Sequence, residues 1–140
     1  MTTKSSGFTL IELMVVIAII GTLSAAATVM YSSYSASAKT TSAKNIMQQV
    51  SLGQTEYLSS YGTYYYTETG GGECTVDVLD GNGATSNNIE TNLFQGGDII
   101  TAQAEYDMCI QLPDSGTGYL IKASNGTTNI TLDHTGTWGE

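Results

Sequence analysis

The sequence predicts an α+β fold in which one long N-terminal helix packs on a C-terminal antiparallel sheet of three or four strands. Two patterns support this prediction. Helical spacing runs through residues 8–60, apolar on all sides at first and on one side later, whereas residues 99–138 alternate as strands do. The 140 residues suffice for one small domain.

The first half of the predicted helix is long and apolar enough to cross a membrane. Residues 8–31 read FTLIELMVVIAIIGTLSAAATVMY, in which Glu12 is the only charged residue. At about 1.5 Å per residue, such a helix spans the roughly 30 Å of hydrocarbon in a bilayer. Lys4 on the short flank predicts a cytoplasmic N-terminus and export of the chain that follows Tyr34.

Three interpretations of this segment compete, namely a cleaved secretory signal, a plain membrane anchor and a membrane segment in which Glu12 has a function. A cleaved secretory signal would have a shorter apolar region and a small-residue cleavage site, which residues 24–27 could supply. A plain membrane anchor is simpler, but it does not explain Glu12. A carboxylate at the centre of a membrane helix costs about 2.5–3.5 kcal/mol on insertion scales, so Glu12 is a candidate functional residue. The alternative is that Glu12 has no partner and that its carboxylate extends toward the membrane surface.

The residues at the start of the apolar run carry a family resemblance. KSSG at 4–7 followed by FTLIE at 8–12 resembles the class III signal of type IV pilins and of the related type II secretion pseudopilins. The match covers residues 4–34, and the rest resembles the family in layout only. The resemblance implies the pilin fold. It also implies that a prepilin peptidase cuts between Gly7 and Phe8 and that the exposed Phe8 is N-methylated.

This resemblance divides the chain into three parts. These are a cleaved leader peptide over residues 1–7, a transmembrane or filament-core half of the helix over 8–34, and a globular head over 35–140. Within the head, we expect the helix to continue over 35–60, a loop over 61–98 and the sheet over 99–138.

Glu12 gains a physical role in such a filament. Cleavage after Gly7 would leave a cationic α-amino group on Phe8, at the edge of an apolar environment. The carboxylate of Glu12 in one subunit could pair with this amine in its neighbour, which offsets part of the free energy of keeping both charges out of water. The pair would also set the axial register. Phe8 and Glu12 are therefore the predicted assembly residues.

The second half of the helix presents an apolar stripe to the sheet. Steps of three and four residues align Ala43, Ile46, Val50, Gly53, Tyr57 and Tyr61. Most polar side chains lie largely off this stripe, namely Lys39, Lys44, Gln48, Gln54 and Glu56. Gly62 stands close to the position where a glycine commonly ends a helix.

The segment after the helix reads as a surface loop. It is rich in Gly, Ser, Thr and Asn, with one short strand expected over 74–79 before a turn at Asp80-Gly81. Asp77, Asp80 and Asn82 could be ligands of a calcium ion. An EF-hand loop, however, needs oxygen ligands at alternate positions, and Val76 and Val78 occupy those positions. The pattern favours an ordinary turn over calcium. The sequence indicates no metal site and no cofactor.

Strands are expected over 104–112, 119–123 and 129–134, with Trp138 covering the sheet edge. In the first strand, one face is directed at the helix and consists of Tyr106, Met108, Ile110 and Leu112. The other face consists of Glu105, Asp107, Cys109 and Gln111. Asp98, Glu105 and Asp107 are expected to face outward and to make the surface negative.

The two cysteines are expected to form a disulfide. Cys109 lies on the strand face away from the helix, and Cys74 lies in a loop that could cover this face. Because an exported protein folds in an oxidising compartment, we predict a Cys74–Cys109 disulfide. Two buried free thiols are the alternative.

Composition narrows the functional classes. Thirteen acidic residues against four lysines and no arginine, a formal net charge of −9, repel phosphate backbones and speak against DNA as a partner. A single histidine, no P-loop and no evident nucleophile–base pair indicate that the protein is not an enzyme.

The resemblance implies a structural subunit of a type IV pilus, polymerised with itself or with other pilins through its N-terminal helix. Such filaments serve adhesion, twitching motility or DNA uptake. The precursor would lie in the inner membrane with its head in the periplasm, and the subunit would then become part of the extracellular pilus. Two alternatives stay open, namely a type II secretion pseudopilin and a minor pilin that captures DNA or another ligand.

Overall fold

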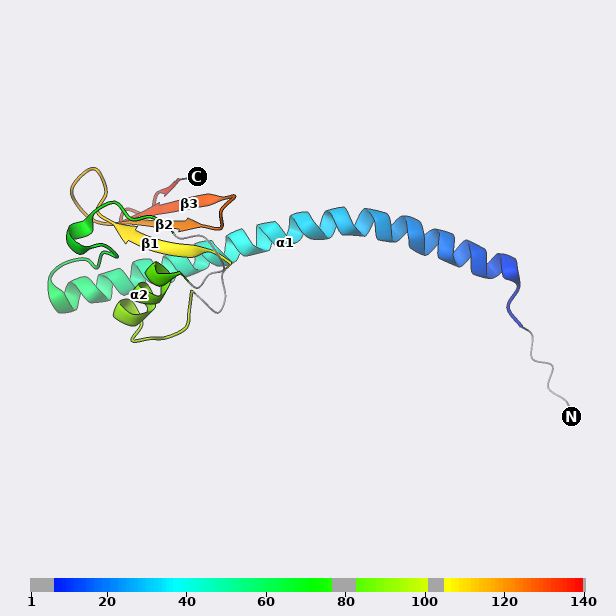
Figure 1. The fold of residues 1–140 in the computed structure, drawn as a ribbon, viewed down its shortest axis with the longest axis horizontal. Helices are drawn as coiled ribbons and strands as arrows, with labels where there is room; N and C mark the ends of the chain where they lie inside the picture. The colour runs from blue at the N-terminus through cyan, green and yellow to red at the C-terminus, as the bar shows by residue number, and fades with distance from the viewer. Residues whose placement is uncertain (1–6, 77–82, 101–104, 140) are drawn as a thin grey trace, which may run out of the picture. The chain divides into compact units, whose positions relative to one another are not determined.

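The computed structural model describes residues 7–76, 83–100 and 105–139 (Figure 1). Its elements are α1 (Leu10–Tyr61), a 3-10 turn (Thr69–Gly71), α2 (Ala84–Leu93), β1 (Asp107–Gln111), β2 (Leu120–Ser124), β3 (Asn129–Asp133) and β4 (Trp138–Gly139). The chain divides into two compact units, Met1–Ala38 and Lys39–Glu140, and α1 contributes to both. The predicted α+β class, with its long N-terminal helix and antiparallel sheet, is confirmed.

The first unit is the apolar part of α1, in which every described side chain up to Tyr34 is exposed. Its most apolar 18-residue window has a mean hydropathy of 2.3, so by length and composition α1 could cross a membrane. Four hydroxyls in this stretch donate to main-chain carbonyls about one turn earlier, and the pairs are Thr22 to Ile19, Ser24 to Ile20, Thr28 to Ala25 and Ser32 to Val29.

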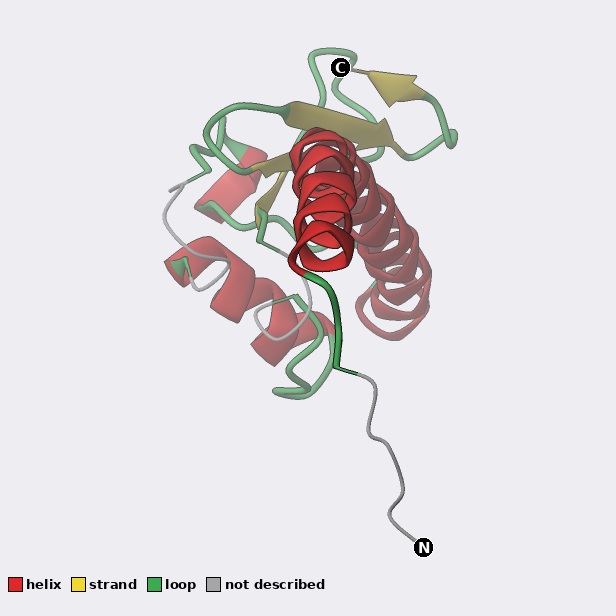
Figure 2. Ribbon diagram, turned by 90° about the vertical axis from the view of Figure 1, so that its right-hand side faces the viewer, coloured by secondary structure: helices red, strands yellow, loops and turns green. Residues whose placement is uncertain are grey.

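The second unit, the head, contains an antiparallel meander in the order β1-β2-β3-β4. Figure 2 shows the strands in yellow. The register places Ile121 opposite Ile110 on one side and opposite Leu132 on the other. These side chains join a buried cluster to which α1 contributes Ala43, Ile46, Met47 and Val50. The predicted strands are therefore confirmed within one to three residues at their ends.

Trp138 extends the sheet as well as shielding it. It pairs with Leu132 to start the short β4, and Lys44 Nζ lies 5.5 Å from the centre of its ring. Asp133 holds the turn before β4, because its Oδ1 accepts hydrogen bonds from the N–H groups of Thr135 and Thr137 and from the Thr135 hydroxyl. These bonds, the one from the hydroxyl above all, lower the pKa of Asp133.

The head portion of α1 follows the predicted stripe with two corrections. Tyr61 is 69% exposed, because it lies in the last turn and extends past the sheet, whereas Gln54 is fully buried. The Gln54 amide donates to the Tyr65 carbonyl at 2.7 Å and accepts from the Tyr65 N–H at 2.9 Å. Periodicity could not indicate this role because the partner is main chain beyond the helix. Gly62 ends α1 with φ +75°, as predicted.

The expected loop over 61–98 contains a helix that sequence reasoning missed. Helix α2 reads ATSNNIETNL, with Ile89 and Leu93 as its only large apolar residues, so it has no apolar stripe to detect. Its neighbours decide its conformation, since it lies against β1 and buries Ile89 in the core. The strand expected over 74–79 does not form at 74–76. Its remainder, and the calcium candidates Asp77, Asp80 and Asn82, lie outside the described residues.

The expectation that Asp107 faces outward is wrong, because Asp107 is only 2% exposed. Its Oδ1 accepts hydrogen bonds from the Gly83 N–H at 2.7 Å and the Ser86 hydroxyl at 3.0 Å. Gly83 has no side chain to cap α2, so Asp107 supplies the acceptor from the neighbouring strand. Strand alternation does not indicate which distant groups meet a side chain, and here the start of α2 meets Asp107. Glu105 does stay exposed and forms an ion pair with Lys39.

The free edge of β1 is covered by segments that precede it in sequence. The N–H of Met108 donates to the Ser86 hydroxyl at 3.0 Å, and the N–H of Ile110 donates to the Thr67 hydroxyl at 2.8 Å. The Thr67 N–H donates in turn to the Ile110 carbonyl at 2.8 Å. An edge strand with satisfied main-chain groups does not offer a template for pairing with another chain.

The predicted Cys74–Cys109 disulfide is present, and both cysteines are buried. The Cys74 N–H also donates to Gln111 Oε1 at 3.2 Å. The disulfide and this hydrogen bond attach a glycine-rich segment to the sheet, on the face opposite α1.

Replacing both cysteines, Cys74→Ser with Cys109→Ser, should lower the free energy of unfolding of the head by about 3–4 kcal/mol, because the disulfide closes a loop between residues separated by 35 positions. Urea unfolding followed by fluorescence of the single tryptophan, Trp138, measures this change. Reducing agent should destabilise the natural chain by a similar amount and leave the double variant unchanged. An equal effect of reductant on both proteins would contradict the prediction.

Gln54→Leu should lower the free energy of unfolding by about 2 kcal/mol, because the N–H and C=O groups of Tyr65 lose their partner. The same urea titration measures it. Gln49→Leu is the matched control, since Gln49 is exposed on the same helix, and should change the free energy by less than about 0.5 kcal/mol. Equal effects of the two substitutions would contradict the prediction that the hydrogen bonds between Gln54 and Tyr65 stabilise the head.

Candidate functional site

The candidate site lies at the start of α1, where Thr9 and Glu12 form a capping box. Oε2 of Glu12 accepts hydrogen bonds from the Thr9 N–H at 2.8 Å and the Thr9 hydroxyl at 2.7 Å, and the Glu12 N–H donates to Thr9 Oγ1 at 3.3 Å. The arrangement satisfies N–H groups that the first turn of a helix leaves without a partner. Sequence reasoning missed this role, although a threonine three residues before a glutamate is its signature.

The box changes the energetic interpretation of Glu12. This residue lies in the first turn of α1, at the end of the apolar run, so the free-energy cost that applies at the centre of a membrane helix does not apply in full. Its negative charge is also favourable beside the N-terminal end of the helix dipole. Both bonds from Thr9 end on Oε2, and a carboxylate has about four lone-pair sites. The carboxylate has the capacity to accept from a cation as well.

The other predicted site residues lie immediately before α1. Phe8 is 89% exposed, and a side chain at Gly7 would meet no atom within 4 Å. Both residues precede the helix, so the Gly7–Phe8 peptide bond lies outside regular secondary structure. The predicted pairing of Phe8 with Glu12 joins two subunits and stays a prediction.

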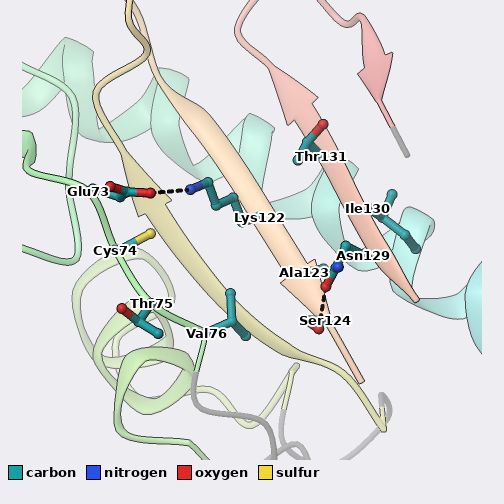
Figure 3. A pocket seen from close by; sticks show the side chains of 10 residues that line it. All are labelled: Glu73, Cys74, Thr75, Val76, Lys122, Ala123, Ser124, Asn129, Ile130 and Thr131. Atoms are coloured by element: carbon teal, nitrogen blue, oxygen red, sulfur yellow. Dashed lines mark hydrogen bonds and ion pairs between the residues drawn. The ribbon is translucent and has the colours of Figure 1, made fainter. Parts of the chain in front are cut away.

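The head carries a groove of about 380 Å³ on the outer face of the sheet (Figure 3). Its polar groups bind one another across it. Lys122 Nζ lies 3.8 Å from Glu73 Oε1, and the Ser124 hydroxyl donates to Asn129 Oδ1 at 2.6 Å. Thr75 and other lining residues add no nucleophile–base pair. Across the described parts of the chain, no group of three or more His, Cys, Asp or Glu side chains could hold a metal ion.

Comparisons with known proteins identify the N-terminal segment. The family described as "Prokaryotic N-terminal methylation motif" matches residues 2–28. A fimbrial protein of Neisseria meningitidis serogroup B is 34% identical over 103 residues, which cover 74% of this chain and 57% of the relative. A type IV major pilin protein, PilE, of Neisseria gonorrhoeae is 37% identical over 81 residues, which cover 58% and 48%.

The chain thus spans about half the length of the curated relatives that it matches. No solved structure matches. The motif lies on the apolar, fully exposed start of α1, and the similarity to the fimbrial protein extends over three quarters of the chain. The comparisons support the type IV pilin family for this chain.

Proposed function

We propose that the chain is a structural subunit of a type IV pilus that is cleaved between Gly7 and Phe8, N-methylated on Phe8 and polymerised through α1. The observation that carries this proposal is the surface of the first unit. Its large apolar side chains are exposed along the whole unit, including Leu10 at 76%, Leu23 at 65% and Met30 at 75%. A continuous apolar surface of this length requires a membrane or other helices to cover it.

The membrane and the filament would cover this surface in succession. The precursor would lie in the inner membrane with its N-terminus cytoplasmic and its head in the periplasm, where a disulfide such as Cys74–Cys109 is stable. In the filament, the first units of copies of this chain or of other pilins would replace the lipid. The transfer exchanges one apolar environment for another, so it involves little change in apolar burial, and specific contacts select the assembled state.

Glu12 would supply such a contact. Methylation leaves the α-amino group of Phe8 cationic, and in the filament this ammonium of one subunit would approach the carboxylate of Glu12 in the next. Breaking a buried ion pair by removing one partner is strongly destabilising, at about 3–5 kcal/mol. A subunit shifted along the axis would leave both charges without partners, so the pair favours one register.

The head would form the outside of the filament and needs no catalytic chemistry of its own. Its acidic composition, with 13 acids in the chain against four lysines, favours a soluble surface. Adhesion and surface motility fit this composition better than direct capture of DNA, because the surface charge repels phosphate groups. We infer that the prepilin peptidase is the enzyme of this system and that the chain is its substrate.

Mass spectrometry of filaments sheared from the producing cells should find a chain that begins at Phe8 and carries one additional methyl group. Gly7→Gln should leave a precursor that still contains residues 1–7, because a Cβ atom at this position meets no atom within 4 Å and the added side chain would obstruct the peptidase. Urea unfolding should show that this variant keeps the stability of the parent head. Filaments built from chains that retain Met1 would contradict the proposal.

Two substitutions separate the capping role of Glu12 from its assembly role. Glu12→Gln keeps a side chain that can form the capping box but removes the charge, so the yield of sheared filaments should fall at least about tenfold while the processed subunit persists in the membrane. Thr9→Ala removes both bonds of the Thr9 hydroxyl, keeps the bond from the main-chain N–H to Glu12 and retains the charge. It should weaken the first turn by about 1 kcal/mol and leave filament yield near that of the parent.

Quantitative immunoblots of sheared and membrane fractions measure both variants. If Glu12→Gln assembled as well as the parent chain, the charge would have no part in assembly. If Thr9→Ala lost its filaments to the same extent, the cap would be the essential feature.

A further inference from the structure

A second, smaller concavity of about 150 Å³ lies in the head, between the end of α1 and the end of α2. One wall is a face of α1 formed by residues three or four positions apart, namely Glu56, Tyr57, Ser60 and Tyr61. The other wall carries Asn92 and Gln95. All of these residues are described, and none belongs to the candidate site at the N-terminus of the chain.

Gly53 and Leu93 bring the two walls close together. A Cβ atom at position 53 would lie 3.4 Å from Leu93 Cβ and 3.4 Å from Phe94 Cζ. These are ordinary contact distances, so the end of α2 packs against α1 beside the concavity.

The aromatic wall is held in place by ring contacts. Tyr61 and Tyr57 stack with their ring centres 4.4 Å apart, and the ring of Tyr57 meets that of Tyr65 at 5.7 Å with an edge-to-face angle of 66°. Tyr61 remains 69% exposed. Tyrosine at such a position combines a large apolar face with little loss of side-chain freedom on binding.

The amide wall is also fixed, partly at the expense of stability. Asn92 Nδ2 donates to the Asn88 carbonyl at 2.7 Å and reaches the Tyr65 hydroxyl at 3.4 Å, which orients its Oδ1. Gln95 has φ 54°, and it is the one non-glycine residue with positive φ among those that the structure describes. Glycine or asparagine usually occupies this position at a helix end. Strained backbone of this kind concentrates at functional sites.

We propose that this groove binds one pyranose ring of a carbohydrate. A pyranose has a face of C–H groups, which suits the tyrosine wall, and a rim of hydroxyls, which suits the amides of Asn92 and Gln95 and the carboxylate of Glu56. The volume of 150 Å³ is far below the roughly 300–1,000 Å³ of pockets for drug-sized ligands, so a single ring is the appropriate size.

The mixed character of the walls argues against a quaternary ammonium ligand. Such cations bind in cages formed mainly by aromatic faces. Here two amides and the Ser60 hydroxyl would lie beside the methyl groups without a partner. The proposed site goes beyond the filament-subunit role and does not depend on it, because every residue that forms it belongs to the head.

Saturation-transfer NMR with the full chain in a polyoxyethylene detergent, which contains neither sugar nor ammonium, tests the site. The probes are the methyl glycosides of glucose, galactose, mannose and N-acetylglucosamine. We expect saturation at the ring C–H protons of at least one glycoside. Tyr61→Ala should raise its dissociation constant about five- to tenfold, because the aromatic contact is lost.

Gln95→Gly distinguishes a binding role from a structural one. The substitution removes the amide and relieves the positive φ, so binding should weaken while the midpoint of urea unfolding stays the same or rises. Tyr34→Ala and Gln49→Ala are matched controls, because both residues are exposed on α1 outside the groove, and both variants should bind as the parent does.

Three results would overturn the site. They are no saturation of any glycoside, binding of tetramethylammonium in place of the glycosides, and unchanged glycoside affinity in both Tyr61→Ala and Gln95→Gly. None of these results bears on cleavage at Gly7 or on filament yield, so the subunit proposal would stand.

Discussion

Helix α1 has to satisfy two environments with one continuous run of main-chain hydrogen bonds, and the rest of the chain is arranged around that constraint. In its first unit every described side chain up to Tyr34 is exposed, so this part of the helix requires an apolar medium or other helices to cover it. Four hydroxyls there, those of Thr22, Ser24, Thr28 and Ser32, bond to the helix itself. From Ala43 onward the same helix buries one side against a sheet and leaves the other side polar.

Polar contacts, more than apolar ones, order the segments that join α1 to the sheet. These segments are rich in glycine and small polar residues. They place Ile89 and Ile100 in the core and pack further side chains against it, namely Tyr64, Tyr65, Tyr66, Leu93, Phe94 and Ile99. Gln54 donates a hydrogen bond to the Tyr65 carbonyl, and the Thr67 hydroxyl accepts one from the Ile110 N–H at the edge of β1. The disulfide links Cys74 to β1, and Asp107 accepts a hydrogen bond from the Gly83 N–H at the start of α2. Ordering flexible segments in this way is entropically expensive, and the buried hydrogen bonds and the covalent link offset part of it.

Glu12 combines a local and a proposed intermolecular role within one side chain. In the single chain it completes a capping box with Thr9, so the precursor does not carry an unsatisfied acid at the start of its helix. The charge that this box retains is available to a cation from a neighbouring subunit. In the proposed transfer from membrane to filament, the carboxylate would keep its hydrogen bonds from Thr9.

The sequence by itself determined the α+β class, the limits of the long helix, three of the strands and the Cys74–Cys109 disulfide. The helix and the strands follow from local periodicity. The disulfide follows from two cysteines in a chain expected to be exported, with Cys109 on the strand face that the loop around Cys74 could cover. Only the tertiary structure decided that ATSNNIETNL is helical, that Asp107 is buried and that Gln54 faces inward. Strand alternation assigns a side chain to a face but does not say what covers the face, and polar residues bury only where a partner from distant sequence meets them.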